Sequence, residues 1–522
     1  MRDNTRNFLF IMCDQLRRDH LGCWGHPYLR TPNIDALAAR GVRFDSAFVN
    51  SGVCTPSRMS FYTGRTMTSH GATWNRVPLS VGEVTLGEYL ARQGRTLALA
   101  GKTHVLTDER GLERMRIARR SALGKRLAVG YFDEVDRYDG HHEPGDESGY
   151  PDFLRRYGYT SDDPWTDYVI SVEDEQGGVH SGWKMRNVHL PSRVAEPHSE
   201  TAYMTEQAIR YIKRQGDKPW ALHLSYVKPH WPYVAPRPYH AMYKADQCLP
   251  LARSLGELEH PHPVLQAYFS HEECTNFRRE EVCARVRPVY QGLVKQVDDQ
   301  LGRLWETLDR LDCWKDTMII FTADHGDFLG DHWLGEKELF FDTVQRVPMI
   351  VYDPTAAADA TRGSVEPRFV SGVDIVPTAL EALGLPGCDE RIEGRSLLPL
   401  LRGEEAPDWR DFVVSELDYS YRKARLVLGR QADECRGWMV RDRRWKYVHW
   451  QGYRPQLFDL ENDPNEYVDL GGDAAYRPQC ERLHARLVDW HAGLKSRVTV
   501  DTRSVEEDTD AVKQWGVFLG EW

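Results

Sequence analysis

A cysteine ahead of a proline and an arginine, in Cys54-Thr-Pro-Ser-Arg58, is the segment whose spacing most directly suggests chemistry. Pro56 suits the first turn of a helix, so Cys54 should lie at a helix N-terminus. The free N–H groups and the dipole of that turn favour a thiolate or a negative oxygen there. The simpler interpretation is a buried cysteine ahead of a helix. A nucleophile at Cys54 therefore needs support from other parts of the chain.

Two acidic segments each follow a predicted strand. Asp14-Gln15 follows a strand over 7–13, and Asp324-His325 follows one over 318–322. Open α/β sheets bind ligands at the carboxyl ends of their parallel strands, so the two segments should meet there. Two carboxylates, an amide oxygen, an imidazole and the side chain at position 54 would surround a divalent cation. Because a lone aspartate at a strand end is more often a turn or cap residue, the site depends on both segments converging.

Other polar side chains follow further predicted strands or lie in nearby loops, namely Asn75, Lys102, His104, His230 and Lys337. Each has an ordinary alternative: a histidine beside proline is often a turn residue, and a lysine is often solvated. Gathered at one sheet edge, they would make a pocket for an anion. Such a local cluster would have to hold the anion against a net charge of −11.

The elements that must position these residues alternate between strands and helices over 1–405. This alternation predicts an α/β fold with a large, mostly parallel sheet sandwiched by helices. The polar stretch 105–198 interrupts it, and we interpret it as an insertion that shapes specificity over the ligand-binding edge. Short strands with close turns over 406–522, including one at 426–428, predict a smaller C-terminal antiparallel α+β sheet domain with a terminal tail.

Composition excludes several classes of protein. The chain has 522 residues, 41% of them hydrophobic, and no apolar run long enough to cross a bilayer. With a sequence pI of about 6.0, it has no bulk basic surface for nucleic acid. None of the ten cysteines forms a C-x-x-C pair, so no zinc knuckle is indicated, and most should be buried thiols. We expect a cytoplasmic protein without membrane or nucleic-acid partners. The aromatic tail 515–522 suggests a homo-oligomer, a dimer or a tetramer, although docking on its own subunit explains it equally well.

Taken in order, the motifs between residue 7 and about 405 resemble those of the type I sulfatases, in the alkaline phosphatase superfamily. The segments 31–44 and 456–464 are also similar to the opening and the C-terminal sheet of that family. The resemblance is to the group of arylsulfatases and phosphonate monoester hydrolases. It implies an alkaline phosphatase-like fold. It also implies that a formylglycine-generating or equivalent maturation enzyme oxidises Cys54 to formylglycine.

The resemblance also assigns roles to individual residues. The metal ligands it implies are Asp14, Gln15, Cys54, Asp324 and His325. The catalytic residues it implies are Cys54, Arg58, Lys102, His104, His230 and Lys337. Substrate binding is assigned to Asn75, Lys102, His230 and Lys337, with Trp74, Trp231 and Tyr233 expected on the leaving-group side.

One divalent metal ion is expected, and its identity follows from the ligands. By the resemblance, familiar calcium-type sulfatases carry Asp and Asn at the positions of Gln15 and His325. Calcium prefers all-oxygen, anionic ligands. An imidazole and fewer carboxylates favour a first-row metal, so we predict Mn²⁺, with Ca²⁺ as the alternative.

The sequence thus predicts a sulfate monoester hydrolase of arylsulfatase type. Phosphonate monoester hydrolases carry smaller or aromatic hydroxyl residues where Lys102 and His104 stand. By this resemblance, the presence of the lysine and the histidine favours sulfate esters. A phosphonate monoester or phosphodiester hydrolase with the same nucleophile is the nearest alternative. A non-catalytic anion- or metal-binding protein with unmodified Cys54 is an alternative of another class. A phosphatase or mutase of the wider superfamily would need a second metal cluster, which the sequence does not indicate.

Overall fold

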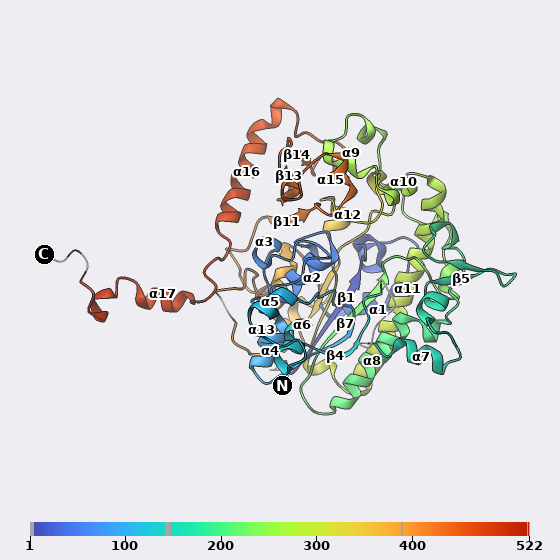
Figure 1. Ribbon diagram of the computed structural model, residues 1–522, viewed down its shortest axis with the longest axis horizontal. Helices are drawn as coiled ribbons and strands as arrows, with labels where there is room; N and C mark the ends of the chain where they lie inside the picture. The colour runs from blue at the N-terminus through green and yellow to red at the C-terminus, as the bar shows by residue number, and fades with distance from the viewer. Residues whose placement is uncertain (1–4, 141–147, 388–389, 519, 521–522) are drawn as a thin grey trace.

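The computed structural model describes residues 5–140, 148–387, 390–518 and 520 (Figure 1). Its main feature is an eight-stranded sheet with the order β10-β2-β9-β8-β1-β7-β3-β4. All neighbouring strands in it run parallel except β9, which is antiparallel to β2 and β8. The predicted α/β class is therefore confirmed. The strands are β1 (Asn7–Asp14), β2 (Val42–Phe48), β3 (Leu97–Gly101), β4 (Phe132–Arg137), β7 (Ala221–Pro229), β8 (Thr317–Ala323), β9 (Met349–Tyr352) and β10 (Val365–Ser371).

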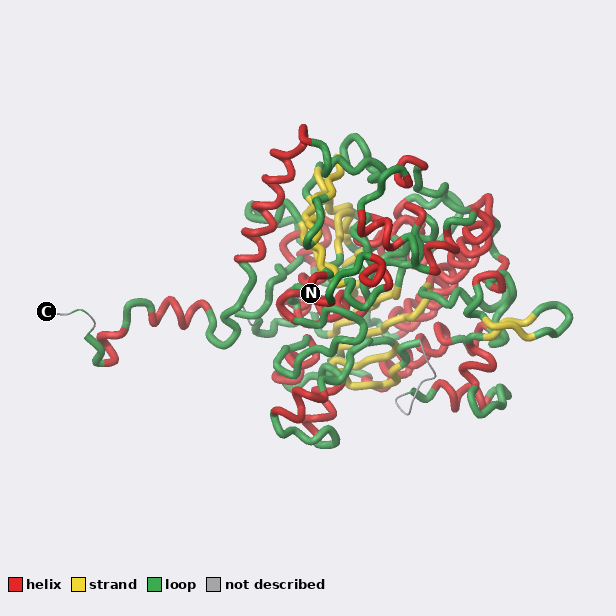
Figure 2. The backbone as a smooth tube through the Cα atoms, turned by 45° about the horizontal axis from the view of Figure 1, so that its top comes forward, coloured by secondary structure: helices red, strands yellow, loops and turns green. Residues whose placement is uncertain are grey.

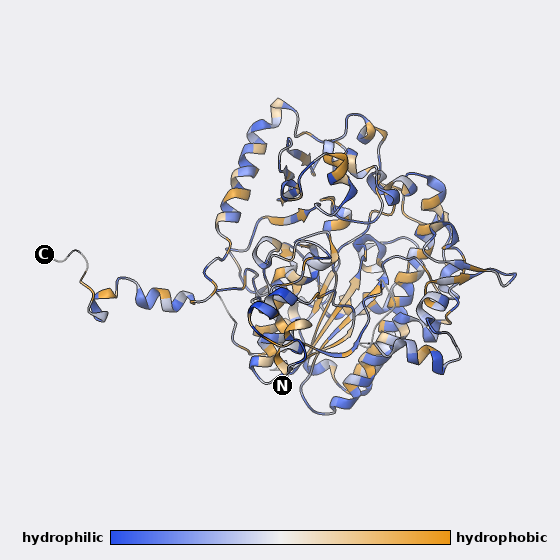
Figure 3. Ribbon diagram, viewed as in Figure 1, coloured by the Kyte–Doolittle hydropathy of each residue, from blue (hydrophilic) through white to orange (hydrophobic). Residues whose placement is uncertain are grey.

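Two helical layers cover the large sheet, which explains why its central strands are apolar throughout. Every residue of β1, β7 and β8 is buried. Figure 1 shows the sheet between the two layers, and Figure 3 shows apolar residues concentrated on its strands. One layer contains α1 (Pro32–Arg40), α8 (Glu200–Gln215) and α11 (Glu280–Arg310); the other contains α2 (Cys54–Thr63), α4 (Leu86–Arg92) and α13 (Ile375–Ala382).

The parallel strands deliver their following residues to one edge of the sheet. Asp14 ends β1, and Asp324 directly follows β8. Lys102 follows β3 after Gly101, whose φ of 111° is unfavourable for other residues. A Cβ on Gly101 would lie 1.9 Å from the backbone oxygen of Ser225 on β7, so a side chain there would separate the two strands.

The segment 105–198 differs in part from the interpretation as an insertion. Phe132–Arg137 forms β4, the edge strand of the large sheet. Its sequence, Phe-Asp-Glu-Val-Asp-Arg, lacks an apolar run because an edge strand is half exposed. The rest of the segment lies outside the sheet and includes α5 (Glu109–Arg114), α6 (Ala122–Ala128), α7 (Tyr150–Arg156) and the hairpin of β5 (Ser171–Glu173) and β6 (Val179–Ser181).

The C-terminal region forms a second, antiparallel sheet of four strands, as expected. Helix α16 (Arg477–Ala492) packs against it through Leu483 and Leu487. The expected strand at 426–428 is wrong, because this stretch falls at the end of helix α15 (Lys423–Val427). The four strands are β11 (Val413–Asp418), β12 (Arg436–Arg441), β13 (Trp445–Trp450) and β14 (Gln456–Asp459).

Beyond α16 the chain leaves the body of the molecule as an arm that carries α17 (Thr502–Asp508) (Figures 1 and 2). Trp515 and Phe518 on this arm are each 61% exposed. None of the described helices is long and apolar enough to span a membrane. Each cysteine that the structure describes is a free thiol, and Cys388 lies outside the described residues.

Candidate active site

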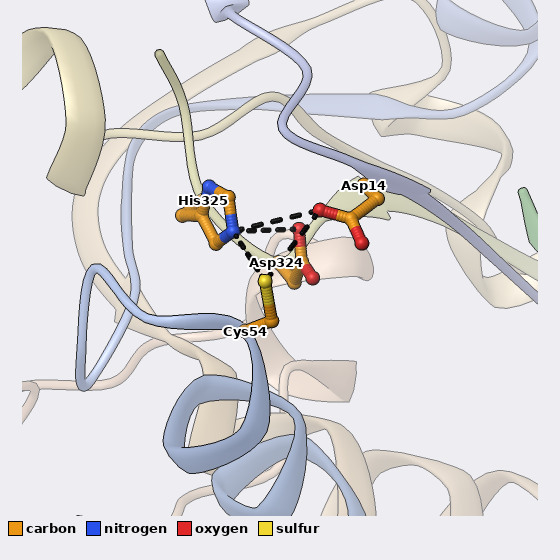
Figure 4. A group of neighbouring side chains, drawn as sticks. All are labelled: Asp14, Cys54, Asp324 and His325. Carbon is orange, nitrogen blue, oxygen red and sulfur yellow. Dashed lines mark hydrogen bonds and ion pairs between the residues drawn. The ribbon is translucent and has the colours of Figure 1, made fainter. Parts of the chain in front are cut away.

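Four side chains from three distant segments meet at the carboxyl edge of the large sheet. Asp14, Cys54, Asp324 and His325 each point one potential ligand atom toward a common centre (Figure 4). These atoms all lie within 4.8 Å of one another, and all four residues are buried. The parallel order of β1 and β8 brings the two aspartates together, and the start of α2 brings Cys54 beneath them.

Positive charges surround the Cys54 thiol. Its Sγ lies 3.0 Å from Lys337 Nζ and 3.2 Å from His325 Nε2. Burial by itself raises the pKa of Cys54, but Lys337, Lys102 and His325 together hold that pKa well below its usual value. The position therefore favours a negatively charged atom at the end of the side chain.

Arg58 lies one turn after Cys54 on α2 and is fully buried. Its Nε lies 2.7 Å from Asp324 Oδ2, and its Nη2 lies 3.5 Å from Asp14 Oδ2. Its Nη1 donates to the backbone oxygen of Lys102 at 3.0 Å and to Ser225 Oγ at 2.8 Å. The guanidinium thus orients both carboxylates and connects α2 to the residue after β3 and to the middle of β7.

The geometry of His325 fits a metal ligand. Its Nδ1 lies 2.8 Å from the backbone oxygen of Gly326, which places a proton on that nitrogen, so Nε2 is the ring atom that would bind a metal ion at the centre. Nε2 lies 3.5 Å from Asp14 Oδ1 and 3.7 Å from Asp324 Oδ1. Burial and the Asp14 charge, opposed by Arg58, leave the pKa of Asp324 raised. Two buried carboxylates, an imidazole nitrogen and the side chain at position 54, with their ligand atoms within 4.8 Å of one another, form a donor set that fits a divalent cation.

The two lysines Lys102 and Lys337 contact different groups of this centre. Lys102 Nζ lies 2.5 Å from Asp14 Oδ2. Lys337 Nζ lies 2.9 Å from His230 Nε2 and 3.4 Å from Gln15 Oε1. Burial, reinforced by Lys337, lowers the pKa of His230 to about 3. In this arrangement His230 is neutral.

His104 and Asn75 lie at a half-buried margin of the site, unlike the residues above. Asn75 Oδ1 accepts a hydrogen bond from the backbone N–H of Thr55 at 2.9 Å, and Thr55 Oγ1 donates to the backbone oxygen of His104 at 3.4 Å. Asn75 thus caps a free N–H in the first turn of α2. Burial, together with Lys102, lowers the pKa of His104.

Two acidic residues that sequence reasoning did not assign to the site support it. Asp327 accepts hydrogen bonds from Gln15 Nε2 and Tyr233 Oη, and so orients the Gln15 amide. Asp327 is the fourth residue of the segment Asp324-His325-Gly326-Asp327, so its place in the sequence could have assigned it to the site. Asp139 accepts the backbone N–H of both Thr103 and His104, at 3.0 and 3.1 Å. Nothing in its sequence context indicated that role.

A cavity of about 770 Å³ lies beside the His230 and Lys337 end of the site. Trp231, which lines it, packs against His230 with 4.7 Å between the two ring centroids, and Glu336, also in the lining, precedes Lys337 in the chain. Trp231 and Tyr233 line it, whereas Trp74 stacks on Tyr421 outside its lining. The other aromatic residues of the lining are Trp183 and Phe277.

The chain has extensive similarity to known proteins. Residues 6–385 match the family description "Sulfatase", and residues 330–493 match "N-sulphoglucosamine sulphohydrolase, C-terminal". The "Multifunctional alkaline phosphatase superfamily protein PehA" of Trinickia caryophylli is 33% identical, over 96% of this chain and 98% of its own. An "Arylsulfatase" of Clostridium perfringens is 25% identical, over 92% and 93%. The phosphonate monoester hydrolase of Agrobacterium radiobacter superposes with a TM-score of 0.81 at 29% identity, covering 93% of this chain and 95% of its own. The family match spans most of the sequence and includes every residue of the converging site, so this chain belongs to the sulfatase family.

Proposed function

We propose that the protein hydrolyses sulfate monoesters, aryl sulfates among them, with a formylglycine derived from Cys54 and one divalent metal ion. One observation carries this proposal: the Cys54 side chain lies among two carboxylates and an imidazole, with Lys337 directly on its Sγ. Sγ then stands where the oxygens of an aldehyde hydrate would be. A hydrate suits the task because a serine or thiol would leave a covalent ester that still has to be hydrolysed.

The metal would be held by Asp14, Gln15, Asp324, His325 and the modified residue 54. When bound, it lowers the pKa of the nucleophile and neutralises oxygens of the sulfate. The preference for Mn²⁺ over Ca²⁺ rests on the imidazole and the amide in this ligand set. Elemental analysis of protein purified without added metal tests it. Stoichiometric calcium alone would overturn the preference.

The remaining residues bind the ester and move protons. Lys102, Lys337 and Asn75 hold the sulfate oxygens in a preorganised, largely dry site. One hydroxyl of the hydrated residue 54 attacks sulfur in line with the leaving oxygen, which takes a proton from His230. His104 then removes the proton from the second hydroxyl, sulfate leaves, and the aldehyde forms again. Arg58 acts as a positioning residue through its contacts with Asp14 and Asp324.

His230 must be protonated to serve as the acid, although its pKa is lowered to about 3 by burial and by Lys337. The negative charge of the bound ester can restore a pKa at which His230 holds a proton. A sulfate placed against Lys337 Nζ engages that lysine and adds a negative charge beside the imidazole, which raises the pKa of His230. The bound ester thus favours the protonated form of His230.

The nearest alternative activity, on phosphonate monoesters or phosphodiesters, is favoured by the structural similarity to the phosphonate monoester hydrolase of Agrobacterium radiobacter. We propose it as a secondary activity of the same site, because Lys102 and His104 are both present. A comparison of kcat/KM for an aryl sulfate and for the matching phenylphosphonate monoester separates the two. A larger value for the phosphonate would reverse the order.

A peptide mass measurement distinguishes all of these activities from a non-catalytic anion- or metal-binding protein. The peptide that contains Cys54 should show conversion of the thiol to an aldehyde when the protein is made alongside a maturation enzyme. A fully unmodified thiol in protein that turns over no sulfate, phosphate or phosphonate ester would favour the binding protein.

We also propose the setting in which the enzyme works. The free state of the described cysteines suits a reducing, cytoplasmic compartment. The exposed apolar arm suits a homo-oligomer, and nothing in the site calls for nucleic acid or membrane. The division into a catalytic domain over 1–405 and a small sheet domain over 406–522 follows the two sheets, and 105–198 supplies Trp183 to the leaving-group cavity.

A further inference from the structure

A second cavity, of about 700 Å³, reaches the site from another direction. Its wall includes His104 and Asn75, the half-buried margin of the site, whereas the first cavity touches the residues next to His230 and Lys337. The second cavity lies beside α6 and β4, and the first lies beside α10 (Glu272–Phe277) and α11. In Figure 1, α6 lies to the left of β1, and α10 and α11 lie to its right.

Basic side chains dominate the wall of the second cavity. Four lining residues are cationic, Arg119, Lys125, Arg126 and Arg137, against two acids, Glu134 and Asp139. Local acids neutralise half of the cations: Arg137 pairs with Asp139 at 2.7 Å, and Arg119 pairs with Glu109 at 3.2 Å.

Lys125 and Arg126 are the cations that remain. Within the described part of the chain, neither lies within ion-pair distance of a carboxylate, and both are exposed. They also belong to a segment of unusual charge. Residues 109–126 contain seven Lys or Arg and two Glu, in a chain whose net charge is −11. The potential of this wall is therefore positive where the protein as a whole is negative.

The position of the second cavity limits which part of a substrate can reach it. A sulfate monoester has one organic group, and that group departs on the His230 side, toward the aromatic cavity. A phosphonate monoester or a phosphodiester carries a second substituent, which stays attached to phosphorus during the reaction. The margin formed by His104 and Asn75 offers this retained substituent a separate exit from the centre.

We infer that the second cavity is a subsite for a negatively charged retained substituent, bound by Lys125 and Arg126. The inference rests on the proposed function, since it adds a substrate class to the secondary activity of the same site. A substituent bearing a carboxylate, phosphate or sulfate would pair with both cations, whereas a neutral one would leave them solvated. The preferred phosphorus substrates are thus esters with two anionic groups.

Two para-nitrophenyl esters test this inference, one of phenylphosphonate and one of para-carboxyphenylphosphonate, with para-nitrophenyl sulfate as the reference that has no retained substituent. For the unaltered protein, kcat/KM should be higher for the carboxylated ester. The double variant Lys125→Gln/Arg126→Gln should reduce that preference about tenfold. Added salt should reduce it as well, because the pair is exposed.

Arg114→Gln/Arg120→Gln is the matched control. It removes two exposed charges from the same basic segment but from residues outside the cavity wall, and it should leave the preference intact. An equal loss in this control would show a general field rather than a subsite, and would overturn the inference. A wild-type protein that shows no preference for the carboxylated ester would overturn it too.

Binding provides a readout that does not depend on turnover. Calorimetry should show tighter binding of para-carboxyphenylphosphonate than of phenylphosphonate, and the Lys125→Gln/Arg126→Gln variant should remove the difference. If no ester of any kind is hydrolysed but this binding difference is present, the proposed function is wrong and the subsite stands. If the esters are hydrolysed and neither binding nor turnover favours the carboxylate, the subsite is wrong and the proposed function stands.

Discussion

At the scale of single residues, the site combines complete burial with dense charge. Asp14, Cys54, Arg58 and Asp324 are all 0% exposed. Charges placed so deeply are tolerated only when each is paired, which is why removal of one partner costs far more than a surface substitution. The two variants below test the residues that touch the reacting atoms.

Replacement of the nucleophile should abolish catalysis without unfolding the protein. Cys54→Ala removes the thiol that is needed for oxidation of Cβ to the aldehyde, so no hydrate can form and kcat/KM for an aryl sulfate should fall at least about 1,000-fold. The melting temperature and circular dichroism spectrum should stay close to those of the parent. Cys23→Ala, a matched change outside the site, should keep full activity. Turnover that survives in Cys54→Ala would remove Cys54 as the nucleophile.

Loss of the general acid should depend on the leaving group. His230→Ala should lower kcat/KM about 100- to 1,000-fold for an alkyl sulfate, whose leaving oxygen needs a proton. For para-nitrophenyl sulfate the loss should be below about tenfold, because that anion leaves unaided. A series of substituted phenyl sulfates measures this as a steeper dependence on leaving-group pKa. Equal losses along the series would exclude His230 as the acid.

At the scale of elements, sequence predicts best the strands whose two faces are both in an apolar environment. β1, β7 and β8 are buried on both faces, so their apolar runs identify them, and the residues that follow them could be placed at one edge. β4 has a half-exposed, charged sequence and could not be told from a loop. Asp139 lies two residues after the end of β4, so its role could not be predicted once β4 was missed.

The region after residue 403 shows the converse error. The apolar run around Leu426 and Val427 was taken as a strand, yet these side chains are 67% and 54% exposed at the end of a short helix. Period and composition do not report whether a short apolar run is buried. Contacts between lysines and histidines in the site, such as Lys337 with His230, are likewise set by loop conformations that no local pattern encodes.

Hydrogen bonds connect the small sheet to the chain on both sides of α2. On β11, the Glu416 backbone N–H donates to the Asn50 oxygen at 2.7 Å, and the Glu416 carboxylate accepts hydrogen bonds from the N–H and hydroxyl of Thr68. Burial raises the pKa of Glu416 to about 7, and the bonds from Thr68 only partly oppose this. The folded protein therefore binds this proton more tightly than the unfolded chain does.

This raised pKa predicts a pH-dependent effect of Glu416→Gln. Stability from the protonated carboxyl is fully present below about pH 4.5 and is lost as the pH rises through about 7, at a cost of about 1 to 3 kcal/mol. Glutamine keeps the neutral form at every pH. The melting temperature of the variant relative to the parent should thus be more favourable near pH 8 than near pH 5. The exposed control Glu404→Gln should show no such trend, and a flat or inverted trend in Glu416→Gln would contradict the raised pKa.

At the scale of the whole molecule, the arm beyond α16 stands out because little of it touches the body. The backbone is anchored up to Lys495, whose N–H donates to Glu393 and whose oxygen accepts from Arg65. Trp515, Val517 and Phe518 beyond it are exposed. Large apolar side chains held away from their own subunit are suited to a contact with a second copy.

Truncation after Lys495 should therefore convert an oligomer into a monomer of slightly under 60.2 kDa. Light scattering coupled to size-exclusion chromatography measures this directly. The double variant Trp515→Ser/Phe518→Ser should weaken assembly without shortening the chain, while Arg503→Gln on α17 should not. A full-length protein that is already monomeric, or a truncated one that keeps its assembly state, would refute this role of the arm.

The depth of Cys54 fixes when its oxidation can happen. His325, which lies against its sulfur, is made 271 residues later in the chain. At about 5–20 residues per second, the ribosome needs on the order of 10 to 60 seconds to reach it. Until then the large sheet lacks β8, and the thiol remains open to the outside. We therefore predict that an enzyme that oxidises Cys54 has to reach the thiol before β8 joins the sheet, because the folded chain buries this side chain completely.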